Sequence, residues 1–484
     1  MENKKITSNL FWRLAERFGA QSVTLIVSVA LARLLDPEVY GMVAIVTVIT
    51  TILQVFLDGG FSNALIQKKD ADDIDFSSVF YFNIVFGLIL YIILFLIAPL
   101  IADFYHMPDL TPVIRVLGLT LIIFSLKSVQ QAYVSRNMMF KRFFFSTLGG
   151  TLGAAVVGIT LAYLGYGVWA LVAQHLFNML VDTIILWFTV KWRPKAVFSF
   201  ERLKVLLSYG WKLLASALLD TIYTDIRQLI IGRMYSPSDL AYYNQGSKYT
   251  GTVVTNINAS IDSVLLPTMS KAQDDVGTVK NMTRRAIKTS TYIIMPMMMG
   301  IAVCAEPLVK LIFTSKWLPC VPYMRVFCFT YAFYPVHTAN LNAIKALGRS
   351  DLFLKLEIIK KSYMAVVLIC TMWFGPMIMA YSCLFTSVLS QMVNSWPNRK
   401  LMDYKYGEQL KDMFPQIGLS CLMGIVVFCV TFLGLSDIIT LLIQIPLGVL
   451  IYVTGSKVFH IDSFNFIISI ARQYLPQKIL KHSK

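Results

Sequence analysis

Apolar runs of about 20 residues recur along the whole sequence, separated by short polar stretches. A run of that length is enough for a helix to cross the hydrocarbon core of a bilayer. The pattern therefore predicts an all-α, polytopic membrane protein with about fourteen transmembrane helices. The predicted spans are 11–34, 40–64, 78–102, 112–134, 143–164, 167–190, 205–233, 240–267, 283–313, 321–345, 352–373, 377–396, 412–433 and 437–455.

The order of residues in the first half recurs about 200 positions later, which indicates a duplicated unit. One match, between 112–120 and 322–330, needs no gap. The others pair Trp12-Arg13 with Trp211-Lys212, Arg33 and Pro37 with Arg233 and Pro237, and Asp72-Asp73 with Asp274-Asp275. We expect two six-helix lobes, 1–200 and 201–405, related by an axis along the membrane normal. A further helix pair at 406–457 and a cytoplasmic amphipathic tail at 458–484, on the anionic inner leaflet, complete the predicted organisation.

Composition and charge narrow the class of protein. The chain is 56% hydrophobic and only 14% charged, with a formal net charge of +16, whereas soluble domains carry about a quarter charged residues. In a membrane protein such an excess is expected in cytoplasmic loops, so nucleic-acid binding is not favoured, and the positions of Lys and Arg place both termini in the cytoplasm. Cysteines and histidines lack metal-ligand spacing and there is no phosphate-binding loop, so we predict no metal and no cofactor.

Polar side chains recur at helical spacing in two consecutive predicted spans, 205–233 and 240–267. They are Lys212, Ser216, Asp220, Thr224 and Arg227 in one span and Gln245, Lys248, Thr252, Thr255 and Ser263 in the next. Ionisable groups at membrane depth are expensive and normally face a bundle interior or a water-filled path. The two faces therefore predict the wall of a polar cavity. Arg13 and Arg17 start a similar face in the first span, and Asp58 ends another in the second.

These charged residues also have plainer interpretations. Arg13 and Arg17 stand where cations near a helix end extend to the membrane surface. Asp220, Asp225 and Arg227 are close enough along one helix to neutralise one another. Both alternatives stay open.

Three other features are assigned to structure rather than to chemistry. Gly59-Gly60 is interpreted as a helix break or a close-packing point, not as a phosphate loop. Arg115 and Arg325 are interpreted as anchors near the outer surface. The aspartates of one loop are interpreted as solvated rather than as a metal site of a glycosyltransferase, because these loops are too short to hold a nucleotide-sugar domain; they are Asp70, Asp72, Asp73 and Asp75.

Several segments resemble the bacterial polysaccharide flippases, the Wzx-type, O-antigen and capsule branch of the multidrug/oligosaccharidyl-lipid/polysaccharide exporter superfamily. They include Leu34–Gly41, Asp58–Gln67, Gly167–Val172, Trp192–Pro194, Leu229–Arg233 and Asp239–Asn244. The resemblance covers about residues 5 to 400. It implies an inner-membrane, multi-pass flippase for undecaprenyl-pyrophosphate-linked glycans, with two lobes around a cationic cavity lined by the first, second, seventh and eighth helices.

The resemblance makes the cations of those helices candidates for binding the pyrophosphate: Arg13, Arg17, Lys212, Arg227 and Lys248. The candidates for ion coupling are Asp58, Asp220 and Asp225, because these carboxylates lie inside the same helices. Expected partners are the lipid-linked oligosaccharide, membrane lipid and the glycosyltransferases and polymerase of the same pathway. A drug/cation antiporter of the superfamily predicts a more acidic cavity. A membrane-embedded glycan polymerase, which is an enzyme, needs a larger outer loop than any predicted here.

Overall fold

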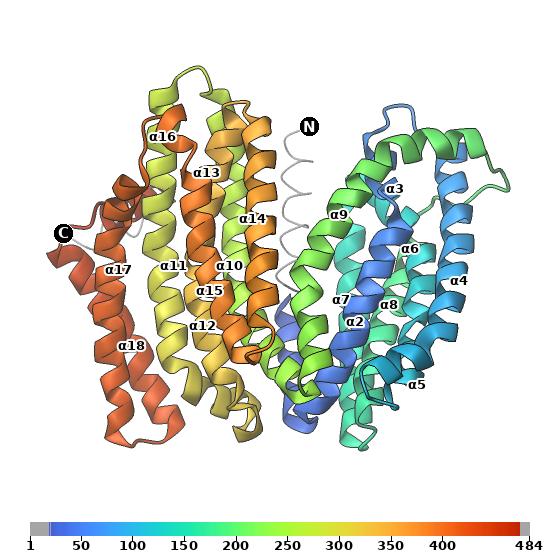
Figure 1. Cartoon of the computed structure of the whole chain (residues 1–484), viewed down its shortest axis with the longest axis horizontal. Coiled ribbons are helices and arrows are strands. Elements are labelled where there is room, and N and C mark those ends of the chain that lie inside the picture. The colour runs from blue at the N-terminus through green and yellow to red at the C-terminus, as the bar shows by residue number, and fades with distance from the viewer. Residues whose placement is uncertain (1–18, 20, 475–484) are drawn as a thin grey trace. The chain divides into compact units, whose positions relative to one another are not determined.

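The structure is a computed structural model that describes residues 19 and 21–474 of the chain. The secondary structure in these residues is helical throughout, with no β-strand, as the sequence predicts. The chain divides into two compact units between Ala241 and Tyr242 (Figure 1).

The helices follow one another with short connections. In the first unit a helix over Gln21–Leu34 precedes α2 (Pro37–Asp58), α3 (Phe61–Gln67), α4 (Asp73–Phe104), α5 (Leu110–Leu117), α6 (Leu119–Arg136), α7 (Phe140–Tyr163), α8 (Val168–Thr189) and α9 (Phe200–Met234). Helix α10 (Pro237–Lys271) leads into the second unit, which contains α11 (Val276–Phe313), η1 (Ser315–Trp317), α12 (Cys320–Ala332), α13 (Tyr334–Ala346), α14 (Ser350–Thr371), α15 (Pro376–Ser395), α16 (Asn398–Leu401), α17 (Tyr406–Cys429), η2 (Val430–Leu433), α18 (Asp437–Val458) and α19 (Asp462–Tyr474).

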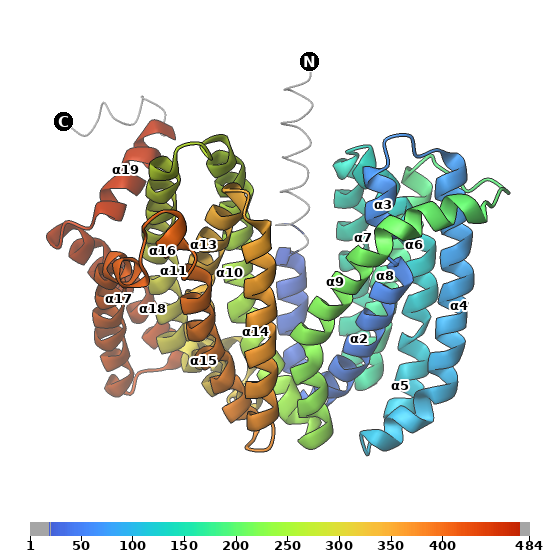
Figure 2. The ribbon, with the colours of Figure 1, turned by 45° about the horizontal axis from the view of Figure 1, so that its top comes forward.

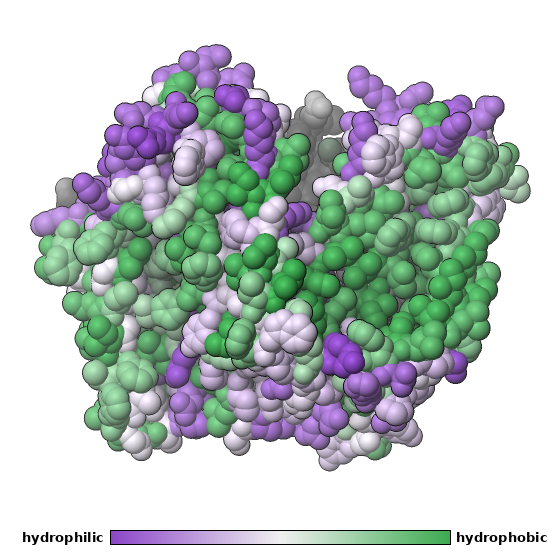
Figure 3. Space-filling model, in the orientation of Figure 1, coloured by the Kyte–Doolittle hydropathy of each residue, from purple (hydrophilic) through white to green (hydrophobic). Residues whose placement is uncertain are grey.

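Ten helical segments in the described part of the chain are long and apolar enough to cross a membrane, by length and composition. In Figure 3 the visible face of each unit has a broad hydrophobic band with hydrophilic residues at both ends. Four predicted spans lie outside the ten: 11–34, 240–267, 321–345 and 352–373. Helix α10 is rich in polar residues, α14 carries five charged residues, and 321–345 is divided between α12 and α13. The number of about fourteen spans stays a prediction.

The two copies of the arginine–proline turn have the same local structure. In both, a helix ends one residue after an arginine, which is Arg33 in the first copy and Arg233 in the second. The next helix then begins with a proline, Pro37 or Pro237. Proline is favoured at the first position of a helix, where a missing N–H costs nothing. A Cβ on Gly41, one turn into α2, would lie 1.9 Å from the Pro237 carbonyl oxygen. The two turns therefore lie at the same end of the first unit.

Helix α9 packs along α2 at glycine positions. Gly59 and Gly60 have φ angles of 55° and 75° and separate α2 from α3, a left-handed backbone that glycine adopts without steric cost. Gly210 of α9 lies directly against this break, because a Cβ on Gly60 would be 2.3 Å from the Gly210 carbonyl oxygen. A Cβ on Gly232, near the other end of α9, would lie 2.9 Å from the Ile45 side chain. The interpretation of Gly59-Gly60 as a helix break and packing point is confirmed.

These contacts place α9 in the first compact unit, which extends to Ala241. The sequence repeat instead puts the boundary between its two copies at residue 200. The two divisions differ by α9. The boundary of the repeat follows from similarity within the sequence, whereas the boundary of the units follows from the packing of the helices.

Buried amide groups and an amphipathic helix characterise the second unit. Asn340, Asn398 and Gln409 are fully buried and hydrogen-bonded to one another, with the Asn398 amide donating to Asn340 Oδ1 at 2.7 Å. The described part of the predicted amphipathic tail is α19, seen best in Figure 2. Phe464 and Ile467 of this helix pack against the hydrophobic core of the unit. Helix α19 is therefore docked on the protein by part of its apolar face.

Candidate functional site

The candidate site of the first unit includes the middle of α9, where the side chains are little buried. Between residues 211 and 226 no side chain is buried, and Lys212, Ser216, Asp220 and Thr224 are all exposed. The buried residues of α9 lie on either side of this stretch, for example at Gly210. The predicted polar face therefore lies on a stretch of α9 in which every side chain is exposed or only partly buried.

The other predicted cations fall in three different situations. Arg227 is buried on α9, with 9% of its surface exposed. Lys248 is exposed on α10 and belongs to the second unit, so its convergence with Lys212 stays a prediction. Arg13 and Arg17 lie outside the described residues.

The candidate carboxylates are held by neighbouring polar side chains. Asp58, the last residue of α2, is half-buried and accepts a hydrogen bond from the hydroxyl of Ser62. Asp225 is half-buried and accepts a hydrogen bond of 2.8 Å from the Gln228 amide. Asp220 is exposed on α9. No ion pair joins Asp58 or Asp225 to Lys212 in the part of the chain that the structure describes. The mutual neutralisation of Asp220, Asp225 and Arg227 stays an open alternative.

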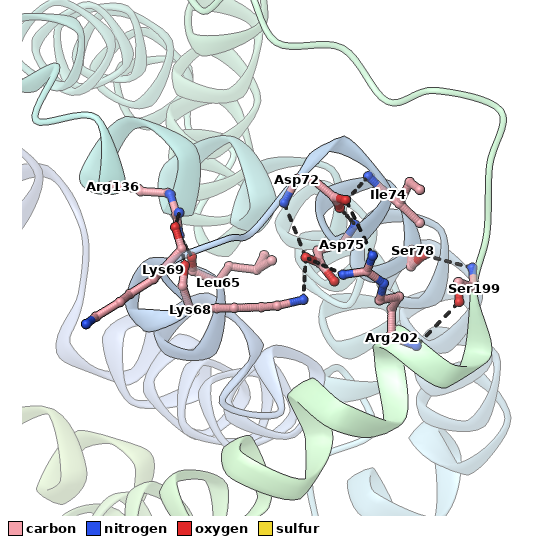
Figure 4. Close-up of polar contacts among 10 residues, drawn as sticks. All are labelled: Leu65, Lys68, Lys69, Asp72, Ile74, Asp75, Ser78, Arg136, Ser199 and Arg202. Carbon is pink, nitrogen blue, oxygen red and sulfur yellow. Dashed lines mark hydrogen bonds and ion pairs between the residues drawn. The ribbon is translucent and has the colours of Figure 1, made fainter.

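A network of charged side chains fastens together the ends of α3, α4 and α9 (Figure 4). Asp75 is fully buried, with Lys68 Nζ 2.6 Å and Arg202 Nη1 3.8 Å from its Oδ2 atom. Asp72 caps α4 by accepting the backbone N–H groups of Ile74 and Asp75, each at 3.1 Å. The expectation of a solvated loop is wrong for Asp75, because two cations offset the cost of removing its carboxylate from water. Among the described residues no group of His, Cys, Asp or Glu could hold a metal ion.

The connection between α8 and α9 is attached to the same end of α4. Lys195 Nζ lies 2.7 Å from Asp73 Oδ2, and the indole N–H of Trp192 donates to the other oxygen of that carboxylate at 3.2 Å. The backbone N–H of Ser199 donates to the hydroxyl of Ser78 at 2.9 Å. The hydrogen bond to Asp73 raises the pKa of Lys195 above its ordinary value. The start of α9 is therefore fixed to the first unit by side chains as well as by glycine packing.

Arg136 ends α6 and caps the C-terminus of α3 (Figure 4). Its Nη1 donates to the carbonyls of Leu65 and Lys68, the first at 2.6 Å, and its Nη2 donates to that of Lys69 at 2.8 Å. The last carbonyls of a helix lack helical partners and favour a nearby cation. This arginine therefore has a structural role besides its contribution to the loop charge.

Arg115 and Arg325 make equivalent contacts in their own units. Arg115 Nε donates to the Phe95 carbonyl of α4 at 3.3 Å, and its guanidinium lies 4.4 Å from the Phe95 ring centre. Pro99 has no N–H, so the Phe95 carbonyl lacks its helical donor. Arg325 Nε donates to the Ala302 carbonyl of α11 at 3.2 Å. These contacts agree with the anchoring interpretation of both arginines.

Two ion pairs inside predicted spans were missed by the sequence reasoning. Lys127 of α6 pairs with Asp182 of α8, and both side chains are nearly buried, at 13% and 12% exposure. Lys360 pairs with Glu357 within α14 at 2.5 Å. Asp182 is the sole carboxylate in the span 167–190 and Lys127 lies in the middle of 112–134. For the first pair, opposite charges within two apolar spans were the available signal, since membrane charges tend to pair.

Comparison with known proteins gives one family match. Residues 30–322 match a family described as "Polysaccharide biosynthesis protein". Over 347 residues the chain is 24% identical to the succinoglycan biosynthesis transport protein ExoT of Rhizobium meliloti (strain 1021), covering 72% of this chain and 70% of that protein. Over 364 residues it is 23% identical to the lipopolysaccharide biosynthesis protein WzxC of Escherichia coli (strain K12), covering 74% and 73%.

Among solved structures, the lipid II flippase MurJ in an inward closed conformation has a similar fold. The TM-score is 0.77 at 16% sequence identity, with 94% of this chain and 99% of that chain covered. At this identity the likeness concerns the helical fold alone.

Proposed function

The chain belongs to the polysaccharide biosynthesis protein family, and from this premise we propose that it is a flippase for lipid-linked glycan units. Membership confirms the resemblance to the polysaccharide flippases of the exporter superfamily. The named relatives, a succinoglycan transport protein and a lipopolysaccharide biosynthesis protein, support a role in making a surface polysaccharide. The proposed cargo is an oligosaccharide on undecaprenyl pyrophosphate, moved from the cytoplasmic to the periplasmic leaflet of the bacterial inner membrane.

The observation that carries this proposal is the uncovered polar face of α9. Lys212 and Asp220 are exposed in a helix that is long and apolar enough to span a membrane. An exposed charge in contact with hydrocarbon is strongly unfavourable, so such groups face water or a polar ligand. A flippase needs a polar path of this kind for the headgroup of its cargo.

The negative charge of the pyrophosphate determines which side chains the transport path needs. Moving a bare dianion into hydrocarbon has a prohibitive desolvation cost. Fixed cations in a hydrated cavity lower that cost, and an arginine binds phosphate oxygens bidentately while a lysine acts as a point charge. The proposed ligands are Arg13, Arg17, Lys212, Arg227 and Lys248. Transport proceeds by alternating access between two lobes, with both termini in the cytoplasm and the polymerase receiving the product outside.

Export of surface polysaccharide in a strain that lacks the chromosomal copy tests the proposal. Lys212→Ala should abolish export while the protein accumulates normally, because the exposed side chain contributes little to folding. Lys212→Arg should retain part of the activity, since the charge is kept. The matched control is Lys204→Ala, which removes an exposed lysine from the same helix two turns earlier.

Normal export by both Lys212→Ala and Arg17→Ala at native protein levels would show that these cations do not handle the cargo. Lipid-linked oligosaccharide that accumulates on the cytoplasmic side of the inactive variants would support the assignment of the cargo. Unchanged leaflet distribution in an inactive variant would place its defect outside transport.

Coupling to an ion gradient is proposed to use Asp58, Asp220 or Asp225. The motive is the position of these carboxylates in α2 and α9. A variant with all three residues changed to Asn should lose the dependence of transport on a proton or sodium gradient in reconstituted vesicles. Full gradient-driven transport by that variant would exclude these carboxylates from coupling.

A further inference from the structure

A cavity of about 550 Å³ lies in the second unit between the first turns of α11 and the start of α19. Figure 2 shows α19 beside that end of α11. The residues that matter for its chemistry are Arg284, Arg285, Lys288, Asp462, Ser463 and Phe466. None of them belongs to the polar faces of α9 and α10, so the cavity is separate from the proposed transport path.

The cations that line the cavity differ in how they are paired. Arg284 forms a bidentate ion pair with Asp412: its Nη2 lies 2.7 Å from Oδ1 and its Nε lies 2.7 Å from Oδ2. Lys288 Nζ lies 3.2 Å from Asp462 and 3.6 Å from Asp412. Within the described residues Arg285 pairs with no carboxylate. Arg285 is therefore the cavity cation that an anionic ligand can bind without displacing a carboxylate.

The cavity also offers hydrogen-bond donors without protein acceptors. The Ser463 side chain is 3% exposed and lines the cavity, and its hydroxyl has no hydrogen-bond partner among the residues that the structure describes. A buried hydroxyl without a partner is costly unless a ligand satisfies it. Ser463 is the second residue of α19, and the start of a helix attracts anions. The Arg285 guanidinium lies 4.5 Å from the Phe466 ring centre, which holds it at the cavity.

The position along the helices indicates where the anion comes from. The cations at 284–288 precede the apolar part of α11, which begins near Tyr292. Cations at the end of an apolar helix lie at the level of lipid headgroups. Val458 and Phe459, just before α19, are 70% and 63% exposed and offer an apolar surface for acyl chains. A small inorganic anion from solution has no apolar part that could bind to this surface.

We propose that this cavity binds the phosphodiester headgroup of an anionic membrane phospholipid. The phosphodiester supplies the negative charge that Arg285 lacks among its protein neighbours. Arg285 forms a charge-assisted hydrogen bond to a phosphate oxygen, and the Ser463 hydroxyl donates to another. The lipid bridges α11 and α19 and stabilises the docked position of α19.

The test uses the full-length chain in neutral maltoside micelles, titrated with dioctanoyl phosphatidylglycerol, dioctanoyl phosphatidylcholine or inorganic phosphate. The apparent melting temperature reports binding, since a ligand of the folded state stabilises it in proportion to its affinity. Phosphatidylglycerol should stabilise the protein at concentrations where the other two have little effect. Arg285→Gln should weaken phosphatidylglycerol binding about ten-fold or more, as expected for a lost charge-assisted hydrogen bond.

Two further variants keep the result interpretable. Arg399→Gln removes an exposed arginine from α16 of the same unit and should leave lipid affinity unchanged. Ser463→Ala should weaken lipid binding without lowering the melting temperature of the lipid-free protein, because it removes an unpartnered hydroxyl. Equal stabilisation by phosphatidylcholine, or equal weakening by Arg399→Gln and Arg285→Gln, would overturn the site. Equal stabilisation by inorganic phosphate would overturn the lipid as its ligand.

Discussion

Replacing Gly60 with alanine should destabilise the first unit by an amount that two structural features determine. The φ angle of Gly60 is 75°, and a left-handed backbone costs a residue with a Cβ about 1–2 kcal/mol. The new Cβ would also lie 2.3 Å from the carbonyl oxygen of Gly210 and 2.9 Å from its carbonyl carbon. Both atoms belong to a helix backbone that has little freedom to move, so overpacking adds roughly 1–3 kcal/mol.

Gly165→Ala is the matched control, because it carries the first penalty without the second. The φ angle of Gly165 is 82°, and a Cβ added there would meet no neighbouring heavy atom within 4 Å. The apparent melting temperature in detergent should therefore fall further for Gly60→Ala than for Gly165→Ala. At about 2–4 °C per kcal/mol for a unit of this size, the difference is roughly 2–12 °C.

Gly210→Ala probes the same contact from the other helix. Alanine is favoured over glycine in a helix interior by about 1 kcal/mol, so an uncrowded site would be stabilised. Here the new Cβ would lie 2.8 Å from the Gly59 carbonyl oxygen, and we expect a net loss. Equal melting temperatures for Gly60→Ala and Gly165→Ala, together with a stabilised Gly210→Ala, would refute the close crossing of α2 and α9.

Three other predictions follow from buried polar contacts. Asp75→Asn should lower the melting temperature strongly, since breaking a buried pair costs about 3–5 kcal/mol. Asp70 is exposed in the preceding loop, so Asp70→Asn should leave the melting temperature unchanged. Equal effects of the two substitutions would contradict the burial of Asp75. Arg115→Ala should destabilise by about 1–3 kcal/mol because a carbonyl loses a charged donor, and unchanged thermal stability would count against this. Lys127→Met and Asp182→Leu should each reduce accumulation of folded protein while the double variant recovers it; additive losses would exclude the pair.

The positions of the helices were predictable because bilayer-length apolar runs dominate the sequence. The turns at Pro37 and Pro237 were predictable for a local reason, since proline opens a helix without losing a hydrogen bond. The packing partner of α9 was not. It depends on backbone contact at Gly60 and Gly210, and glycines leave no hydrophobic pattern from which a partner helix could be inferred.

The candidate site was predictable in part for the same physical reason. A row of polar residues at helical spacing identifies the exposed stretch of α9, because one helix determines which side chains share a face. The loop aspartates are held in part by distant cations instead: Arg202 lies beside Asp75 and Lys195 pairs with Asp73, each more than 100 residues away. Short-range patterns carry no information about such a contact, so a string of aspartates looked like a solvated loop.

The packing of α9 also accounts for the exposure of its cation. Successive residues of an α-helix are rotated by about 100°, so Lys212 points about 200° away from Gly210. With Gly210 pressed against the α2–α3 break, Lys212 must point away from the body of the first unit, and it is exposed. Gly210 thus fixes the position of α9, and Lys212, two residues later, carries its charge on the opposite side of the helix. If the exposure arises in this way, Gly210→Ala should impair export as well as stability, because a helix displaced from the break no longer holds Lys212 in that direction.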